Sequence, residues 1–285
     1  EEVDTVVAIN IVASSFSFLG ALFVILVYCG FGEVRSYSFR LILYMSICDL
    51  FLSFAYLLGP MHSSDAMCTS QAVLISYFGL ASILWSAVLA LSLYLFVVKQ
   101  NMQVPDFEVK FALFSFVFPI LMTFLPFSTD SYGDQHGQCW LKVEDTEGIV
   151  WAVLQFYIPL WLTVVFNSYC FFLAYKELKV LIEGVGNMPE EERQLKLNNV
   201  KRLKYYPLVL VICWIFASIN AFYILANPKN PSLGLTILDQ GLGAMQGFFN
   251  AVVYGLNPVV RGALRSTYRA CCPCFYIKED KPNRV

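Results

Sequence analysis

The sequence predicts an all-α membrane protein, a bundle of seven transmembrane helices followed by a short amphipathic helix. The chain is 58% hydrophobic and only 14% charged, whereas an average soluble domain has about 25% charged residues. Seven apolar stretches are long enough to cross a bilayer as helices, for which roughly 20 residues are needed. Basic residues are concentrated in the segments that would lie on one side of the membrane. We therefore expect a single seven-helix domain over residues 1–285.

The spans are predicted in order from the apolar stretches and the residues that interrupt them. The third, at 69–98, contains no Asp, Glu, Lys or Arg; as a helix it would be ~45 Å long and would cross the bilayer with a tilt. Proline can kink the fourth and fifth spans, and Asn257-Pro258 ends the seventh, which is rich in glycine. Besides 69–98, the expected spans are 6–28, 39–58, 111–127, 149–175, 206–226 and 233–256, and the basic amphipathic helix is expected at 259–270.

The distribution of charge predicts the orientation. Of the 19 Lys and Arg residues, 17 fall in the segments 30–40, 99–110 and 176–204 or in the tail from 259. The positive-inside rule then places the C-terminus in the cytoplasm and the N-terminus outside, as an odd number of spans requires. We expect an integral protein of the plasma membrane. The outer segments carry nine acidic residues, which either form a solvated surface or attract cations.

The nine cysteines do not form one disulfide framework. Cys68 and Cys139 both fall on the outer, oxidising side, so we expect a disulfide between them, with two free thiols as the alternative. Three further cysteines follow the amphipathic stretch on the cytoplasmic side, where reversible palmitoylation is favoured. Zinc is disfavoured there because both histidines lie on the outer side, and apart from a sodium ion near Asp49 we expect no metal site. The expected lipidation sites are Cys271, Cys272 and Cys274.

Two ionisable side chains, Asp49 and Asp239, lie within predicted spans, where such groups are costly and often functional. Span seven also carries a polar stripe at i, i+4 and i+7, formed by Asn250, Tyr254 and Asn257. We expect Asp49 to face this stripe and to hold a cation such as sodium, a proton or water with it. The alternative is a protonated Asp49 that is hydrogen-bonded within the bundle.

The sequence offers no catalytic constellation. The two aspartates lie at different depths, because the helical rise predicts a separation of ~10 Å along the membrane normal. An aspartyl dyad needs carboxyl groups in contact. No His-Glu-x-x-His, Gly-x-Ser-x-Gly or phosphate-loop motif occurs. We therefore assign no catalytic residues, predict that the protein is not an enzyme, and expect no nucleic-acid partner.

Kinked helices leave cavities between them, and such cavities are common ligand sites in bundles. Aromatic and polar residues in the spans are candidates to line one, although packing or lipid-facing roles are equally open to them. The candidates are Trp85, Trp161, Asn167, Trp214, Asn220 and Asp239.

The largest cytoplasmic loop, 176–204, contains a helix start at Pro189 to Glu192, with proline first and acids in the first turn. A helix from there would continue into span six and present a basic surface to a partner. The alternative is that these basic residues only reflect the positive-inside rule. The expected docking residues are Lys196, Lys201, Arg202 and Lys204.

Six segments of the spans form a recognisable set when they are read together and in order. They are Asn10 to Phe18 (NIVASSFSF), Tyr44 to Leu50 (YMSICDL), Tyr205 to Trp214 (YYPLVLVICW), Ser218 to Asn220 (SIN), Leu238 to Gly241 (LDQG) and Phe249 to Asn257 (FNAVVYGLN). The set resembles the cyclic-AMP-receptor-like seven-helix receptors of slime moulds and, more closely, their plant relatives. The likeness covers nearly the whole bundle.

The resemblance implies a G-protein-coupled-receptor fold, with an outward cavity for an extracellular ligand and a cytoplasmic face for a heterotrimeric G protein. Two features depart from related receptors. The inner end of span three reads Leu93 to Phe96 (LYLF), without the acidic-Arg pair of rhodopsin-like receptors, and the outer face offers only Lys142 and Lys229 to an anion such as cyclic AMP. A structural subunit or a transporter on the same scaffold is the alternative function, and membrane lipids are partners in every case.

Overall fold

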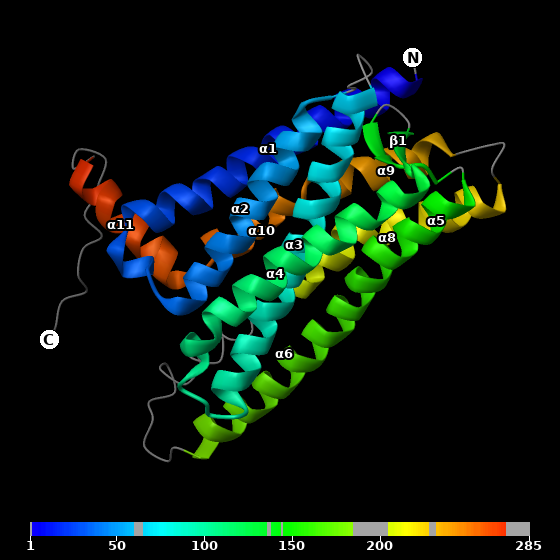
Figure 1. Ribbon diagram of the computed structural model, residues 1–285. Coiled ribbons are helices and arrows are strands. Elements are labelled where there is room, and N and C mark those ends of the chain that lie inside the picture. Colours follow the sequence, from blue (N-terminus) through cyan, green and yellow to red (C-terminus); the bar gives the residue numbers. More distant parts are fainter. Residues whose placement is uncertain are drawn as a thin grey trace, which may run out of the picture.

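The computed structural model describes residues 2–59, 65–135, 138–143, 145–184, 205–227 and 232–271. These residues form a nearly all-helical bundle with one small hairpin (Figure 1). Within this part of the chain, six helices are long and apolar enough to cross a membrane. They cover Val3–Gly30, Tyr37–Leu57, Asp65–Val97, Val104–Thr129, Thr146–Ile182 and Leu208–Ala226. The predicted all-α membrane fold is therefore confirmed, with the first six spans close to their expected positions.

The first three long helices are α1 (Glu2–Gly30), α2 (Tyr37–Leu57) and α3 (Asp65–Val97). A short 3-10 helix, η1 (Gly32–Val34), joins α1 to α2, and another, η2 (Val104–Phe107), precedes α4 (Glu108–Phe124). The central helix is α3: it contacts α2, α4, α6 and the hairpin. Its apolar residues are buried over most of its length, so the longest uncharged stretch of the sequence lies inside the bundle.

Prolines mark the irregular turns in the fourth and fifth spans. After α4 the chain continues as the 3-10 helix η3 (Leu125–Thr129), which has Pro126 in its first turn. The fifth span consists of α5 (Thr146–Ala152), a π-helical turn η4 (Val153–Tyr157) and α6 (Ile158–Gly184). Pro159 has no N–H to donate to a carbonyl of the preceding turn, which accounts for the wider turn just before it. The sixth span is α8 (Tyr205–Ala226).

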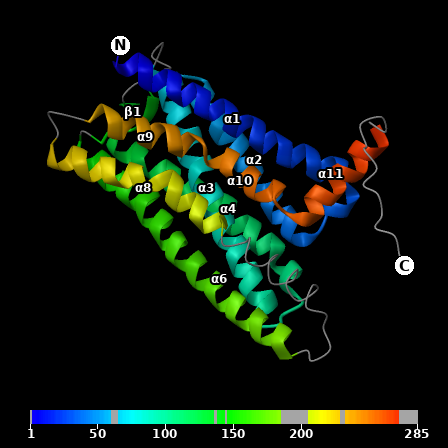
Figure 2. The same ribbon diagram turned by 180° about the vertical axis from the view of Figure 1, so that it is seen from behind.

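The seventh predicted span is not one continuous helix, which corrects the prediction for 233–256. It is formed by α9 (Leu233–Ala244) and α10 (Gln246–Gly255), which follow one another beside α1 (Figure 2). At Met245 the backbone leaves the helical region, with φ −83° and ψ 2°, and its N–H bonds the carbonyl of Leu242. Glycines on both sides of the break, at 243 and 247, lower the helix propensity there. That α9 and α10 together cross the membrane remains a prediction.

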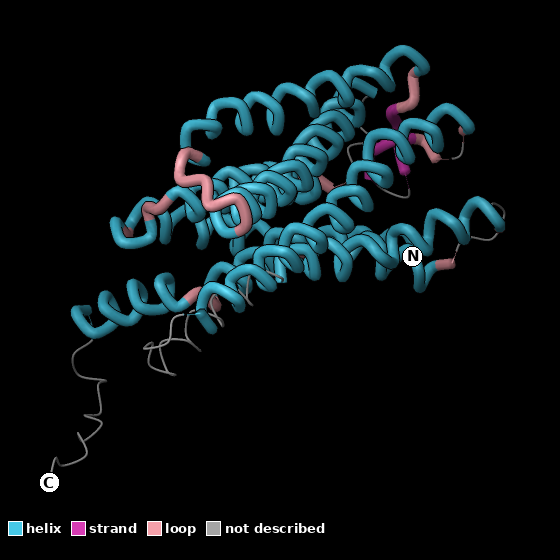
Figure 3. Tube along the Cα trace, turned by 90° about the horizontal axis from the view of Figure 1, so that it is seen from below, coloured by secondary structure: helices cyan, strands magenta, loops and turns pink. Residues whose placement is uncertain are grey.

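The last described helix is α11 (Pro258–Cys271), which lies where the amphipathic helix 259–270 was expected. Its apolar side contacts the core, because Val260 and Ala263 are buried in a cluster with Val34 of η1. Figure 3 shows that α11 lies at the end of the bundle away from the N-terminus and the strands.

The hairpin consists of β1 (Tyr132–Gln135) and β2 (Gln138–Leu141), paired antiparallel with Asp134 opposite Cys139. The disulfide between Cys68 and Cys139 confirms the predicted pairing and ties β2 to the start of α3. Burial raises the pKa of the Tyr132 phenol, so its hydroxyl remains protonated and donates to the carbonyl of Thr123 at 2.8 Å. The hairpin is thus held to both α3 and α4.

Gln71 joins three segments next to this disulfide. Its side chain is fully buried, and its Nε2 donates to the carbonyls of Ala55 and Gly59, both at 2.9 Å. Its Oε1 accepts the backbone N–H of Cys139 at 3.3 Å. One amide therefore satisfies backbone groups at the end of α2 and in β2 that an apolar side chain would leave without a partner.

We predict that Gln71→Leu destabilises the protein, because buried backbone groups that lose their partners cost about 1–3 kcal/mol each. The melting temperature of the purified protein in detergent should fall by about 5 °C or more. Ser70→Ala is the control: this neighbouring hydroxyl is exposed and bonds only within its own helix, to the carbonyl of Ala66. Equal melting temperatures for Gln71→Leu and the wild type would contradict the role given to Gln71.

Candidate functional site

A buried polar network surrounds Asp49 in the middle of α2. The Asp49 side chain is 2% exposed. Its Oδ1 accepts hydrogen bonds from Ser82 Oγ at 2.6 Å and from Gln246 Nε2 at 3.1 Å, and its Oδ2 accepts one from Asn250 Nδ2 at 2.8 Å. Because these donors come from α3 and α10, one carboxyl group connects three helices.

Gln246 extends the network to a fourth helix, α8. Its Nε2 also lies 3.0 Å from Ser82 Oγ, and its Oε1 accepts the indole N–H of Trp214 at 2.7 Å. Neither Ser82 nor Gln246 was predicted from the sequence. A signal for Gln246 was present, since it lies four residues before Asn250 and therefore on the same face of the helix.

Two glycines of the seventh span allow this close packing. A Cβ at Gly247 would lie 2.6 Å from Ser17 Oγ and 3.1 Å from the Cβ of Asp49, and a Cβ at Gly243 would lie 2.9 Å from the ring of Trp214. Side chains at these positions would push α10 away from α1 and α2, or α9 away from Trp214. The glycines therefore act in helix packing around the network.

The rest of the predicted polar stripe does not join Asp49. Tyr254 is buried, with its ring packed edge-on against Phe39 at 5.6 Å between centroids. Asn257 follows the end of α10, where its Oδ1 accepts the N–H of Val259 at 3.0 Å and caps α11. The expected four-residue site is thus corrected to Asp49 and Asn250 with Ser82 and Gln246, because α10 ends before it can carry Asn257 on the same face.

A cavity of about 370 Å³ lies next to this network. Its wall is built from α2, α3, the hairpin, α5, η4, α6, α8 and α9, which places it towards the end of the bundle that carries the disulfide. Four of the six residues proposed for a ligand cavity line it, namely Trp161, Trp214, Asn220 and Asp239.

The other two candidates are not among the residues that line this cavity, and their placement is corrected here. Trp85 is fully buried, with ring contacts to Tyr44 and Phe116, so it fills space between α2, α3 and α4. Asn167 is fully buried too, and its Nδ2 donates to Ser86 Oγ at 2.9 Å, which links α6 to α3. Both side chains are used in packing helices onto α3.

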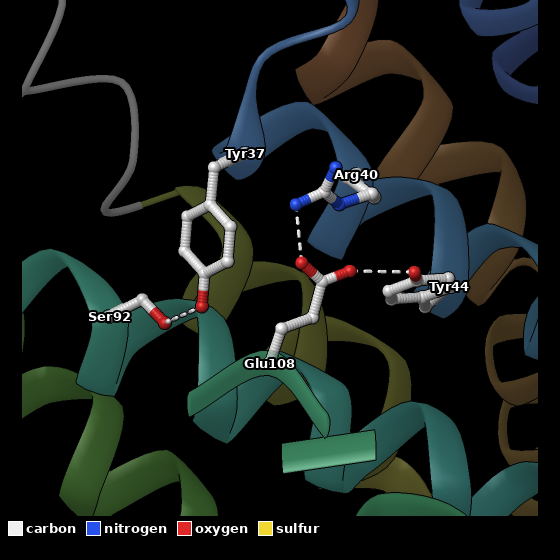
Figure 4. Close-up of polar contacts among 5 residues, drawn as sticks. All are labelled: Tyr37, Arg40, Tyr44, Ser92 and Glu108. Atoms are coloured by element: carbon white, nitrogen blue, oxygen red, sulfur yellow. Dashed lines mark hydrogen bonds and ion pairs between the residues drawn. The ribbon is translucent and has the colours of Figure 1, made fainter. Parts of the chain in front are cut away.

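A second polar group lies between α2, α3 and α4 (Figure 4). Arg40 forms an ion pair with Glu108 at the start of α4, and the Tyr44 hydroxyl donates to Glu108 Oε1 at 2.8 Å. Tyr37 Oη lies 3.5 Å from Ser92 Oγ of α3, and its ring packs against Phe96. We call these five residues, Tyr37, Arg40, Tyr44, Ser92 and Glu108, the α2–α4 contact. This contact was not predicted from the sequence.

Two predicted sites lie wholly or partly outside the described residues. The basic residues expected to dock a partner, Lys196, Lys201, Arg202 and Lys204, are outside them, as are Cys272 and Cys274. Cys271 is the last residue of α11.

The fold is shared with a solved receptor. The chain resembles squid rhodopsin with a TM-score of 0.76, at 13% sequence identity, over 96% of this chain and 87% of that one. At this low identity the likeness concerns the fold alone.

Sequence comparisons identify relatives along nearly the whole chain. G-protein coupled receptor 1 of Arabidopsis thaliana is 31% identical over 94% of this chain and 83% of its own length. Cyclic AMP receptor-like protein A of Dictyostelium discoideum is 24% identical over 90% of this chain and 66% of its own length. The profile of the family described as "Slime mold cyclic AMP receptor" matches residues 1–270. The chain therefore belongs to the slime mold cyclic AMP receptor family, and it is a G-protein-coupled-receptor-like membrane protein.

Proposed function

We propose that this membrane receptor binds an extracellular ligand in the cavity and transmits the change through the Asp49 network to a cytoplasmic heterotrimeric G protein. The observation that carries the proposal is the position of Trp214, which lines the cavity and also donates to Gln246 of the network. A ligand that moves this indole would alter hydrogen bonds shared by α2, α3, α8 and α10. Two sites coupled through one bistable packing arrangement are what a signalling receptor needs.

The orientation and the partner belong to the same proposal. The distribution of basic residues supports a cytoplasmic C-terminus and an outer N-terminus. A receptor for an extracellular ligand in this orientation would reside in the plasma membrane. Palmitoylation at Cys271, Cys272 and Cys274 would anchor the end of α11 at the inner surface. The name of the Arabidopsis relative supports a G protein as partner, and membership of a receptor family favours signalling over catalysis.

The proposed docking surface gives the first prediction on function. Purified receptor in lipid vesicles should accelerate nucleotide exchange on a heterotrimeric G protein several-fold, and the triple change of Lys201, Arg202 and Lys204 to Gln should abolish most of this, because the anionic partner surface loses its counter-charges. The matched control changes three basic residues of the tail, Lys278, Lys281 and Arg284, to Gln. If nucleotide exchange is not accelerated and unrelated membrane subunits copurify with the protein in a fixed ratio, the structural-subunit alternative is favoured.

The α2–α4 contact gives a second prediction. Glu108→Gln removes the charge that pairs with Arg40, so α2 and α4 should separate more readily at this end, and exchange in the absence of added ligand should rise about two- to fivefold, the effect of a shift of about 0.5–1 kcal/mol. Asp106→Asn is the control, because this nearby acid is exposed. If both variants keep wild-type basal exchange, the contact does not restrain the inactive arrangement.

We also propose that a sodium ion binds at Asp49. The carboxylate and Ser82 Oγ are oxygen ligands of the kind that sodium accepts, provided that the amides of Gln246 and Asn250 turn their oxygens inwards. Added sodium, but not equimolar potassium, should then raise the melting temperature of the wild type and leave that of Asp49→Asn unchanged. Equal responses of both proteins to sodium would leave Asp49 as a hydrogen-bonded member of the network only.

A further inference from the structure

We infer that the cavity selects a compact, largely apolar ligand that carries a positive charge, such as an amine, with Asp239 as its counter-ion. The inference rests on the proposed function, since it takes the cavity as the ligand site, and it adds the chemical class of the ligand.

The charge of the wall has one sign. Asp239 of α9 lies on the wall, and its Oδ2 accepts a hydrogen bond from Asn220 Nδ2 at 3.0 Å. No Lys, Arg or His is present among the described residues that line the cavity. A phosphate or carboxylate in this space would meet a like charge and no counter-ion, which is a costly arrangement in a poorly hydrated site. An ammonium group would instead gain an ion pair with Asp239.

The remaining wall suits an apolar body with a cationic group. Leu52, Ile75 and Val153 contribute aliphatic surface. Aromatic rings attract cations over their faces, and they do so more strongly where water is excluded. The indole N–H groups of Trp161 and Trp214 are already bonded, to Ser218 Oγ at 3.0 Å and to Gln246 Oε1 at 2.7 Å. The aromatic residues of the wall are Tyr56, Trp140, Phe156, Tyr157, Trp161, Trp214 and Phe222.

Unpaired polar atoms in the wall provide an independent indication of a ligand. Gln155 of η4 lines the cavity and is 2% exposed, and its Oε1 has no hydrogen-bond partner within the described residues. The Tyr132 hydroxyl donates to the carbonyl of Thr123, and its oxygen can still accept from the nearby Gln155 Nε2 and Ser76 Oγ. Asn220 Oδ1, beside Asp239, also has no hydrogen-bond partner within the described residues. Buried groups of this kind are normally satisfied, and a ligand with a hydrogen-bonding group would satisfy them.

The size of the cavity limits the ligand to a small molecule. Its volume of about 370 Å³ is at the lower end of the range of roughly 300–1,000 Å³ for small-molecule sites. A bicyclic aromatic amine fits this volume, and such a molecule can place its ring among the aromatic side chains and its ammonium group at Asp239.

The test compares probes that share one indole ring and differ in charge. Tryptamine, tryptophol and indole-3-acetate carry a positive, neutral and negative group respectively, and cyclic AMP is added as a second anion. Equilibrium dialysis against the purified full chain should give tryptamine a Kd of about 1 mM or tighter. Tryptophol should bind at least about tenfold more weakly, and neither anion should bind detectably, because only the positively charged probe forms an ion pair with Asp239.

Two variants locate the effect. Asp239→Asn should weaken tryptamine at least about tenfold and leave tryptophol unchanged. Asp130→Asn is the matched control: it removes the same charge at a side chain that is 99% exposed, and it should leave both affinities at the wild-type values. If Asp239→Asn does not fold, as its melting curve would show, the charge series on the wild type still decides the question.

The inference is overturned if tryptamine fails to bind, if an anionic probe binds as tightly, or if Asp239→Asn keeps full affinity for tryptamine. These results would leave the receptor function standing, because nucleotide exchange on the G protein is measured without any of the probes. Conversely, selective binding of tryptamine by a chain that never accelerates exchange would support the ligand class and contradict the signalling role.

Discussion

The hydrogen bonding of the Asp49 carboxyl group is the constraint on which the helix arrangement depends. A carboxyl group buried in an apolar bundle is costly unless donors surround it. Here Ser82, Gln246 and Asn250 supply them from α3 and α10. Each donor reaches Asp49 only if its helix has the correct rotation and depth, so satisfying this group fixes how three helices face one another.

The break at Met245 follows from the same requirement. Gln246 lies directly after it, fully buried, and bonds Asp49, Ser82 and Trp214 at once. Gly243 and Gly247 on either side let Trp214 and Asp49 approach the backbone. A bulkier sequence here would form a more regular helix but would hold the seventh span away from the network. The local loss of helical regularity is therefore offset by polar contacts that no continuous apolar helix provides.

Composition was sufficient to predict the first six spans, because a stretch of uncharged residues has few alternatives to a buried or lipid-facing helix. The meeting of Asp49 with Asn250 was predictable too, since costly groups must find partners. Residue type alone does not distinguish Trp85, which packs against Tyr44 and Phe116, from Trp161, which lines the cavity. That difference depends on helix rotation, which is set by the whole bundle. Likewise, the helix end that turns Asn257 into a cap of α11 is a tertiary feature.

The α2–α4 contact bears on the absence of an arginine at the end of α3. The sequence there reads Leu93 to Phe96, and the neighbouring contacts of α3 are uncharged: Ser92 lies by the Tyr37 hydroxyl and Phe96 packs against its ring. The ion pair lies instead between Arg40 and Glu108, and the guanidinium of Arg40 also lies 5.8 Å from the centre of the Tyr37 ring. Movement of α2 at this end must therefore disturb a charged contact with α4 and an aromatic contact with α3 together. Since α2 also carries Asp49, the network in the bundle centre and the contact at its end are connected through one helix.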